Sequence, residues 1–195
     1  MSSVVGRELI PVEGWVTGLR FDGRLVYLWY GSDSDGQDCI AGRAGQLHTF
    51  SSEEACRTTA AERGWPGADG DDEVVEVTDL EPAQAWLRGK RITLDPQAGL
   101  DLWNWGADVA HSTGRGFHTG GAVGSAGHDQ LFAAAVPWVY KMESYRPIWS
   151  PRQLRVLREV LGRAVNLIRV TTLDGQAGRR ARPRQDHSGV RRALG

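Results

Sequence analysis

The chain has 195 residues, enough for one large domain or two small ones, and 41% of them are hydrophobic, which suffices for a buried core. Its net charge of −1 excludes the class of proteins that bind nucleic acid through a strongly positive overall charge. The two cysteines, Cys39 and Cys56, lack zinc-site spacing and are too few for a secreted disulfide framework. Residues 1–15 contain no signal-peptide core, and no apolar run could span a membrane. We therefore expect a soluble, cytoplasmic protein.

The N-terminal half has strand patterns interrupted by short helices. The expected elements are strands over 14–20, 25–30, 46–50 and 73–77, and helices over 52–63 and 79–89. Asp22-Gly23 separates the first two apolar runs and is typical of a hairpin turn. Ser51 and Glu54 have the spacing of a capping box, which predicts that Ser51 begins the first helix.

Beyond about residue 90 the pattern becomes helical. Helices are expected over 95–113, 128–135 and 151–170, and a glycine-rich loop over 114–127. Asp95-Pro96 and Ser150-Pro151 each combine an N-cap residue with a proline at the first helical position. The helix after Asp95 is apolar on two faces, so we expect it to be buried.

These elements predict an α+β fold, in which a small antiparallel sheet with short helices packs on a helical C-terminal half. The strand-rich region covers 1–90 and the helical region 91–173, and the two could form one domain. Residues 174–195 carry six Arg and two Asp without apolar periodicity, so we expect a disordered basic tail. The tail could bind RNA or DNA phosphates, and its simpler interpretation is a solubilising end.

Five residues with acid–base or metal-ligating side chains lie within a short segment: Asp108, His111, His118, His128 and Asp129. Asp108 and His111 are three apart on one helix and could converge. A metal site needs three or four such ligands held together, and the HExxH pattern is absent. The alternative interpretation is that these are polar groups at the wet edge of a buried helix. We expect no bound metal and no cofactor.

An acidic stretch precedes the helical half, and its candidate partner-binding residues are Asp69, Asp71, Asp72, Glu73 and Glu76. Opposite charge steers the encounter with a basic partner, so this stretch could be a docking surface. The alternative interpretation is a solvated loop and strand edge.

The segment from Trp103 to Leu161 carries a series of short motifs. They are Trp103-Asn104, Asp108-Val109-Ala110, Ser112-x-Gly114, Asp129-x-Leu131-Phe132, Pro137 and Glu143-x-Tyr145-x-Pro147-x-Trp149-Ser150. In these motifs the segment resembles a family of uncharacterised actinobacterial proteins that are similar to immunity proteins of bacterial toxin systems. The resemblance implies a protein-binding role, and its motif residues are mainly aromatics and helix caps, which favour folding over catalysis.

We therefore expect a non-enzymatic binding protein, an immunity- or antitoxin-like partner of another protein, with no membrane association. The alternative is a small hydrolase or metal-dependent enzyme that uses the Asp/His cluster near residues 108–129. A second alternative is nucleic-acid binding through the Arg-rich tail.

Overall fold

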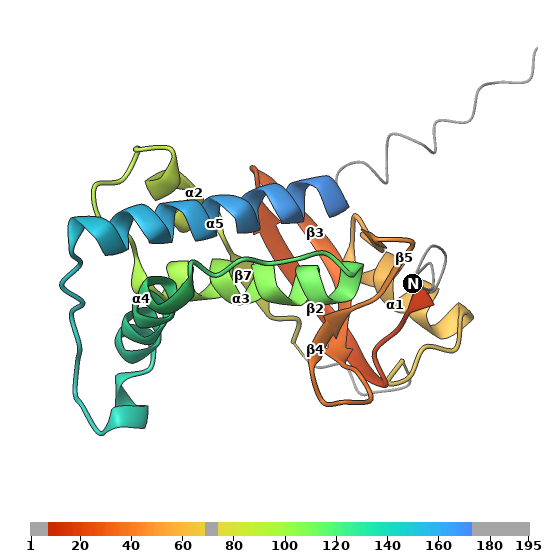
Figure 1. The fold of residues 1–195 in the computed structure, drawn as a ribbon. Coiled ribbons are helices and arrows are strands. Elements are labelled where there is room, and N and C mark those ends of the chain that lie inside the picture. Colours follow the sequence, from red (N-terminus) through yellow and green to blue (C-terminus); the bar gives the residue numbers. More distant parts are fainter. Residues whose placement is uncertain (1–7, 69–73, 173–195) are drawn as a thin grey trace, which may run out of the picture.

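The computed structural model describes residues 8–68 and 74–172 (Figure 1). The tail predicted over 174–195 and the acidic residues Asp69, Asp71, Asp72 and Glu73 lie outside the described residues. The α+β class is confirmed, because strands form the N-terminal half and helices the C-terminal half.

A four-stranded sheet has the order β4-β3-β2-β7. Its strands are β2 (Glu13–Phe21), β3 (Arg24–Ser32), β4 (Asp38–Ile40) and β7 (Val77–Asp79). The predicted hairpin is present: Asp22 and Gly23 both have positive φ, as the tight turn between two twisted strands requires. The sheet is antiparallel except for β7, which pairs parallel with β2. A strand pattern in the sequence locates a strand but does not give its direction.

A smaller sheet has the order β1-β5-β6 and is made of β1 (Glu8–Leu9), β5 (Gly42–Arg43) and β6 (Gln46–Leu47). The strand predicted over 46–50 is therefore shorter, although Phe50 forms a single bridge with Tyr27. Helix α1 (Glu53–Glu62) follows. Its N-cap is Ser52 rather than the predicted Ser51, because the Ser52 hydroxyl accepts the 3.2 Å hydrogen bond from the Ala55 N–H. The prediction of a strand over 73–77 was wrong for 74–76, because β7 begins only at Val77.

The C-terminal half is helical. Its helices are α2 (Glu81–Leu87), α3 (Pro96–Thr113), α4 (Gly121–Ala135), the 3-10 helix η1 (Pro137–Tyr140) and α5 (Pro151–Thr172). The long helices α3 and α5 lie side by side along the molecule, and α4 with η1 forms an arm beside them (Figure 1).

The loop predicted over 114–127 was too long, because α4 already begins at Gly121. Two glycines explain the error. A Cβ on Gly127 would lie 3.1 Å from Leu157 of α5, and one on Gly124 would lie against the Thr119 carbonyl. These glycines allow close packing within a helix instead of giving a flexible loop.

The main core joins both halves of the chain. Its fully buried members include Leu28 of β3, Leu102 of α3, Leu131 of α4 and Leu157 of α5. A second cluster on the opposite face of the sheet contains Val16, Trp29, Cys56 and Trp65, and α1 covers it. The sheet is thus enclosed by α3 and α5 on one face and by α1 on the other.

Candidate functional site

Two of the five predicted Asp/His residues lie together on the sheet side of α3. The hydroxyl of Tyr30 donates a 3.0 Å hydrogen bond to Oδ2 of half-buried Asp108. One turn further along α3, Nε2 of His111 lies 2.7 Å from Oδ2 of Asp33, which follows β3. Each of the two α3 residues therefore contacts a partner from the strand region.

The other candidates lie apart from this pair. His118 accepts a 3.1 Å hydrogen bond from the Gly120 N–H at Nδ1, and Arg163 of α5 donates to its backbone carbonyl at 3.1 Å. The ring of His128 packs against Trp103, with ring centroids 5.2 Å apart, and only its Nδ1 approaches Asp129, at 4.0 Å. Within residues 8–68 and 74–172, no three His, Cys, Asp or Glu side chains are arranged to hold a metal ion.

Burial raises the pKa of the Asp108 carboxyl to about 7. The hydrogen bond from Tyr30 and the nearby His111 lower this pKa, whereas the charge of Asp38 raises it. Burial, together with the charges of Asp108 and Asp38, raises the pKa of the Tyr30 phenol. Burial also raises the pKa of the Cys39 thiol to about 11. Asp108 can therefore exchange protons near neutral pH, whereas Cys39 stays a protonated thiol and is a poor nucleophile.

Ser112 anchors this part of α3 to the sheet. Its hydroxyl accepts a 2.8 Å hydrogen bond from the Ile40 N–H of β4 and lies 2.6 Å from the Asp108 carbonyl. Near the hydrogen bond between Tyr30 and Asp108, the ring of Tyr30 makes tilted contacts with Trp15 and Trp105, with centroids 5.6 Å apart in each pair. The sequence did not identify these residues, because contacts between α3 and the strands join positions more than seventy residues apart.

Two pairs of carboxylates define what we call the acidic notch: the charge of Asp38 acts on Asp108, and the charge of Glu76 acts on Asp101. Asp101 and Asp108 are seven apart on α3 and share one face. Burial raises the pKa of Asp101, which the charges of Asp95 and Glu76 raise further, while a hydrogen bond from Gln97 opposes them. Glu76 is the one predicted partner-binding residue that the structure describes, and its carbonyl accepts a 2.8 Å bond from the Gly18 N–H.

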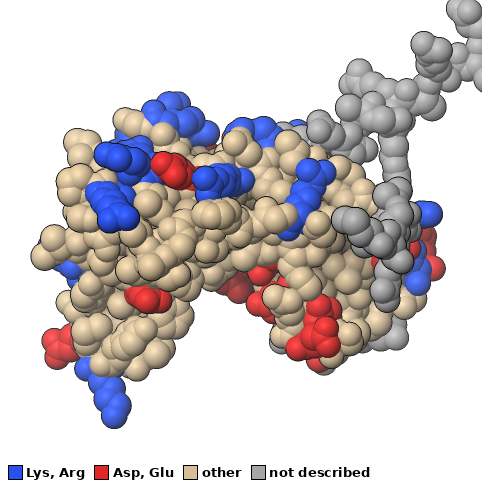
Figure 2. Space-filling model, viewed as in Figure 1, with Lys and Arg blue, Asp and Glu red and all other residues tan. Residues whose placement is uncertain are grey.

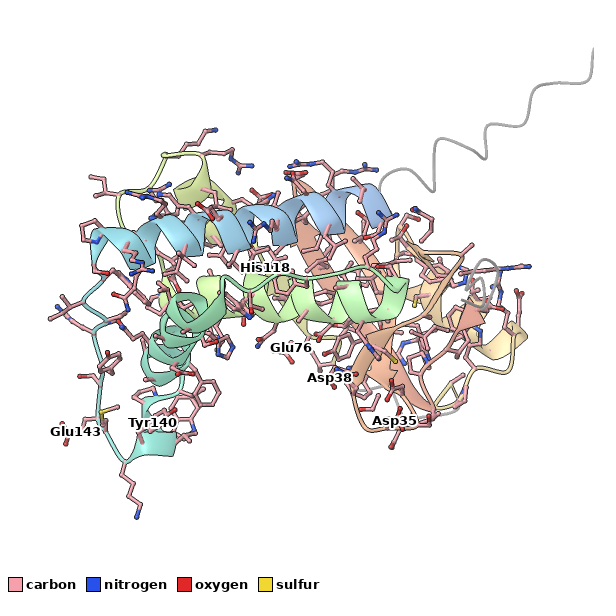
Figure 3. All side chains as sticks on the ribbon, viewed as in Figure 1. Asp35, Asp38, Glu76, His118, Tyr140 and Glu143 are labelled. Atoms are coloured by element: carbon pink, nitrogen blue, oxygen red, sulfur yellow. The ribbon has the colours of Figure 1, made fainter. Side chains whose placement is uncertain are left out.

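The notch is visible on the molecular surface. Figure 2 shows a hollow between the lobe of the arm and the lobe of the sheet, with acidic side chains on the sheet side. Asp38 and Glu76 lie there below α3, whereas His118 lies beside α5 (Figure 3). In the described part of the chain, none of the four notch carboxylates forms an ion pair.

The arm beside the notch exposes apolar side chains. Trp138, Val139 and Tyr140 of η1 are 68%, 56% and 51% exposed, and all three belong to one turn of helix. Contiguous exposed apolar groups mark interaction surfaces more often than isolated ones do.

No helix in the described ranges has both the length and the apolar character needed to cross a membrane. Comparisons with protein-family models, with curated proteins and with solved structures find no match.

Proposed function

We propose that this chain is a non-enzymatic binding protein whose acidic notch receives basic side chains of another protein, in the manner of an immunity protein. The observation that carries the proposal is the set of four notch carboxylates without an ion-pair partner among the described residues. The like charges of Asp38 and Asp108, and of Glu76 and Asp101, oppose one another, so a cation that approaches either pair is stabilised.

The raised pKa values of Asp101 and Asp108 support this proposal. Both carboxyls are partly desolvated, and an entering lysine or arginine would favour their charged forms. The exposed apolar residues Trp138, Val139 and Tyr140 would add an apolar contact next to the charged one. Aromatic anchors beside a complementary charged surface are typical of protein interfaces.

The proposed role requires no cofactor. We also infer a cytoplasmic location, which is supported by Cys39 and Cys56, both free and buried. Reduced cysteines are the usual state in a compartment rich in thiol reductants.

The test is a comparison of two triple variants that lose the same charge. Asp38→Asn, Glu76→Gln and Asp101→Asn neutralise three of the four notch carboxylates, and Glu54→Gln, Glu62→Gln and Glu159→Gln neutralise three exposed acids on α1 and α5, away from the notch and the arm. Immobilised wild-type protein and both variants are exposed to lysate of the native host, and the retained proteins are compared. We expect a basic protein that the wild type and the control retain, that the notch variant loses, and that added salt releases. Equal retention by all three proteins would contradict the proposal.

A second candidate function has support from Asp108 itself. A carboxyl with a pKa of about 7 suits a general acid or base at neutral pH, so a small hydrolase remains the alternative. The substitution Asp108→Asn would then abolish function in the cell, while the notch triple variant would keep it. The binding proposal instead predicts that the notch triple variant impairs function in the cell more than Asp108→Asn does.

A further inference from the structure

A pocket lies at the N-terminal ends of α3 and α5, and it shares no residue with the notch. It has a volume of about 540 Å³ and forms where α2, the start of α3, the segment 146–149 and the first turns of α5 meet. The residues that define what we call the Arg–Trp pocket are Trp86, Leu94, Arg146, Trp149, Leu154 and Arg158. Pro96 and Pro147 complete apolar walls, so the two guanidinium groups are the only charged groups in the lining of this pocket.

The two arginines have different surroundings. The guanidinium of Arg158 lies 4.1 Å from the centre of the Trp86 ring and donates a 3.3 Å hydrogen bond to the Trp86 carbonyl. Arg146 is exposed. Within the described ranges no carboxylate pairs with either arginine. Asp95, which adjoins Pro96, accepts the 3.1 Å capping bond from the Ala98 N–H.

We propose that the Arg–Trp pocket binds a small amphipathic carboxylate. The apolar body would displace water from the half-buried side chains of Trp149 and Leu154, which is favourable in proportion to the area buried. The carboxylate would accept charge-assisted hydrogen bonds from the guanidinium groups, whose fork geometry matches its two oxygens. The volume falls within the range of small-molecule sites.

The burial of the Trp86 ring favours a small ligand over nucleic acid. Further basic side chains, including Arg152 and Arg155, lie near the pocket on α5, and Figure 2 shows Lys and Arg along this side of the molecule. Nucleic acid, however, needs exposed ring faces on which its bases can stack. Trp86 is only 1% exposed, and Arg158 covers its ring.

The probe is naphthoate, a bicyclic aromatic carboxylate, and its binding is measured by isothermal titration calorimetry. Naphthamide, its neutral amide, and acetate, which lacks the apolar body, are titrated in parallel. We expect naphthoate to bind about tenfold or more tightly than either, because hydrogen bonds between charged groups and apolar burial both contribute. Equal affinity for naphthoate and naphthamide, or no binding of naphthoate, would overturn the proposal.

Three variants locate the site. Arg146→Gln and Leu154→Trp should each weaken naphthoate binding about tenfold or more, the first by removing a cation and the second by filling the pocket. The matched control, Arg155→Gln, removes an exposed arginine of α5 that does not line the pocket and should bind as the wild type does. Arg146 is exposed, so its variant should melt at the wild-type temperature and decides the test even if Leu154→Trp unfolds.

Two further results would overturn the proposal. One is unchanged binding by the folded Arg146→Gln variant. The other is an oligothymidylate that binds more tightly than naphthoate and loses affinity in Arg146→Gln, which would assign the pocket to nucleic acid. Both results are independent of the acidic notch, since the two sites share no residue.

Discussion

The hydroxyl of Tyr30 donates a 3.0 Å hydrogen bond to the carboxylate of Asp108 and thereby joins β3 to α3. The ring of Tyr30 lies between Trp15 and Trp105, 5.6 Å from each centroid. The bond lowers the pKa of Asp108 against the larger effect of burial. Tyr30 therefore has two separable roles, ring packing and control of the Asp108 charge.

The substitution Tyr30→Phe keeps the ring and removes the hydrogen bond. We expect the free energy of unfolding to fall by about 1 kcal/mol, the usual net value of one such bond. The pKa of Asp108 should rise above its wild-type value, because one interaction that favours the charged form is lost. Urea denaturation measures the first effect and carbon-detected NMR titration the second. A lower pKa of Asp108 in the variant would refute this account of the bond.

The raised pKa of Asp108 also predicts how stability depends on pH. Its folded-state pKa of about 7 lies above the ordinary value of 3.8, so the folded protein binds this proton more tightly than the unfolded chain does. The contribution is complete below the unfolded pKa and is lost as the pH rises through about 7. The substitution Asp108→Asn should raise the melting temperature at about pH 8 and change it little at about pH 5. The exposed control, Asp35→Asn, should retain the wild-type pH profile, and a common profile for all three proteins would contradict the prediction.

Arg169 near the end of α5 holds the β2–β3 turn through Asp22. Its Nε lies 2.9 Å from Oδ2 and its Nη2 3.1 Å from Oδ1, while Gln84 donates to the same carboxylate at 2.8 Å. The substitution Arg169→Met keeps an apolar stem and should reduce the free energy of unfolding by about 1 kcal/mol at neutral pH, a value that allows for partial solvent screening.

The loss in Arg169→Met should disappear in acid. The hydrogen bond from Arg169 lowers the pKa of Asp22 below 3.8. The stabilisation is therefore present above the unfolded pKa and is lost as the pH falls through the lower, folded-state pKa. Denaturation of Arg169→Met and of the exposed control Arg155→Met at neutral and acid pH measures the loss of unfolding free energy and shows whether that loss shrinks in acid. A difference between wild type and Arg169→Met that grows in acid would be inconsistent with this pairing.

Two helical glycines provide a matched pair. A Cβ on Gly106 of α3 would lie 2.6 Å from Cβ of Ala164 of α5, whereas one on Gly162 of α5 has open space around it. We expect Gly106→Ala to destabilise the protein by about 1–3 kcal/mol through overpacking. Gly162→Ala should stabilise it by about 0.5–1 kcal/mol, because alanine loses less backbone entropy in a helix. Denaturant midpoints measure both, and equal shifts in the same direction would show that α3 and α5 are not in tight contact at Gly106.

The elements that the sequence predicted well are those with strong local signals. Asp22-Gly23 specified the hairpin, and Ser150 caps α5 as expected, with its hydroxyl accepting a 3.2 Å bond from the Gln153 N–H. The glycines of α4 misled the prediction, because a glycine needed for close packing has the same appearance in a sequence as one in a loop. The parallel pairing of β7 with β2 was not predicted, because the direction of a strand is set by long-range packing and not by a local pattern.

The candidate site was only partly predictable, because local spacing can be seen in a sequence whereas long-range contacts cannot. Asp108 and His111 are one turn apart on α3, so their proximity could be inferred from helical spacing. Their partners Tyr30 and Asp33 are 78 residues away in the sequence and are brought near only by the packing of α3 on the sheet. His118 and His128 were grouped with them because of closeness in sequence, and the structure gives them other neighbours.

The most direct test of the acidic notch is the pKa of Asp108 measured with and without the basic protein that the wild type retains. Selective ¹³C labelling of aspartate allows this carboxyl to be followed by NMR, with Asp108→Asn to assign its signal. The account predicts a pKa of about 7 in the free protein and a lower pKa in the complex, because the partner's cation would favour the charged carboxylate. A pKa of Asp108 that is unchanged or raised in a saturated complex would contradict it.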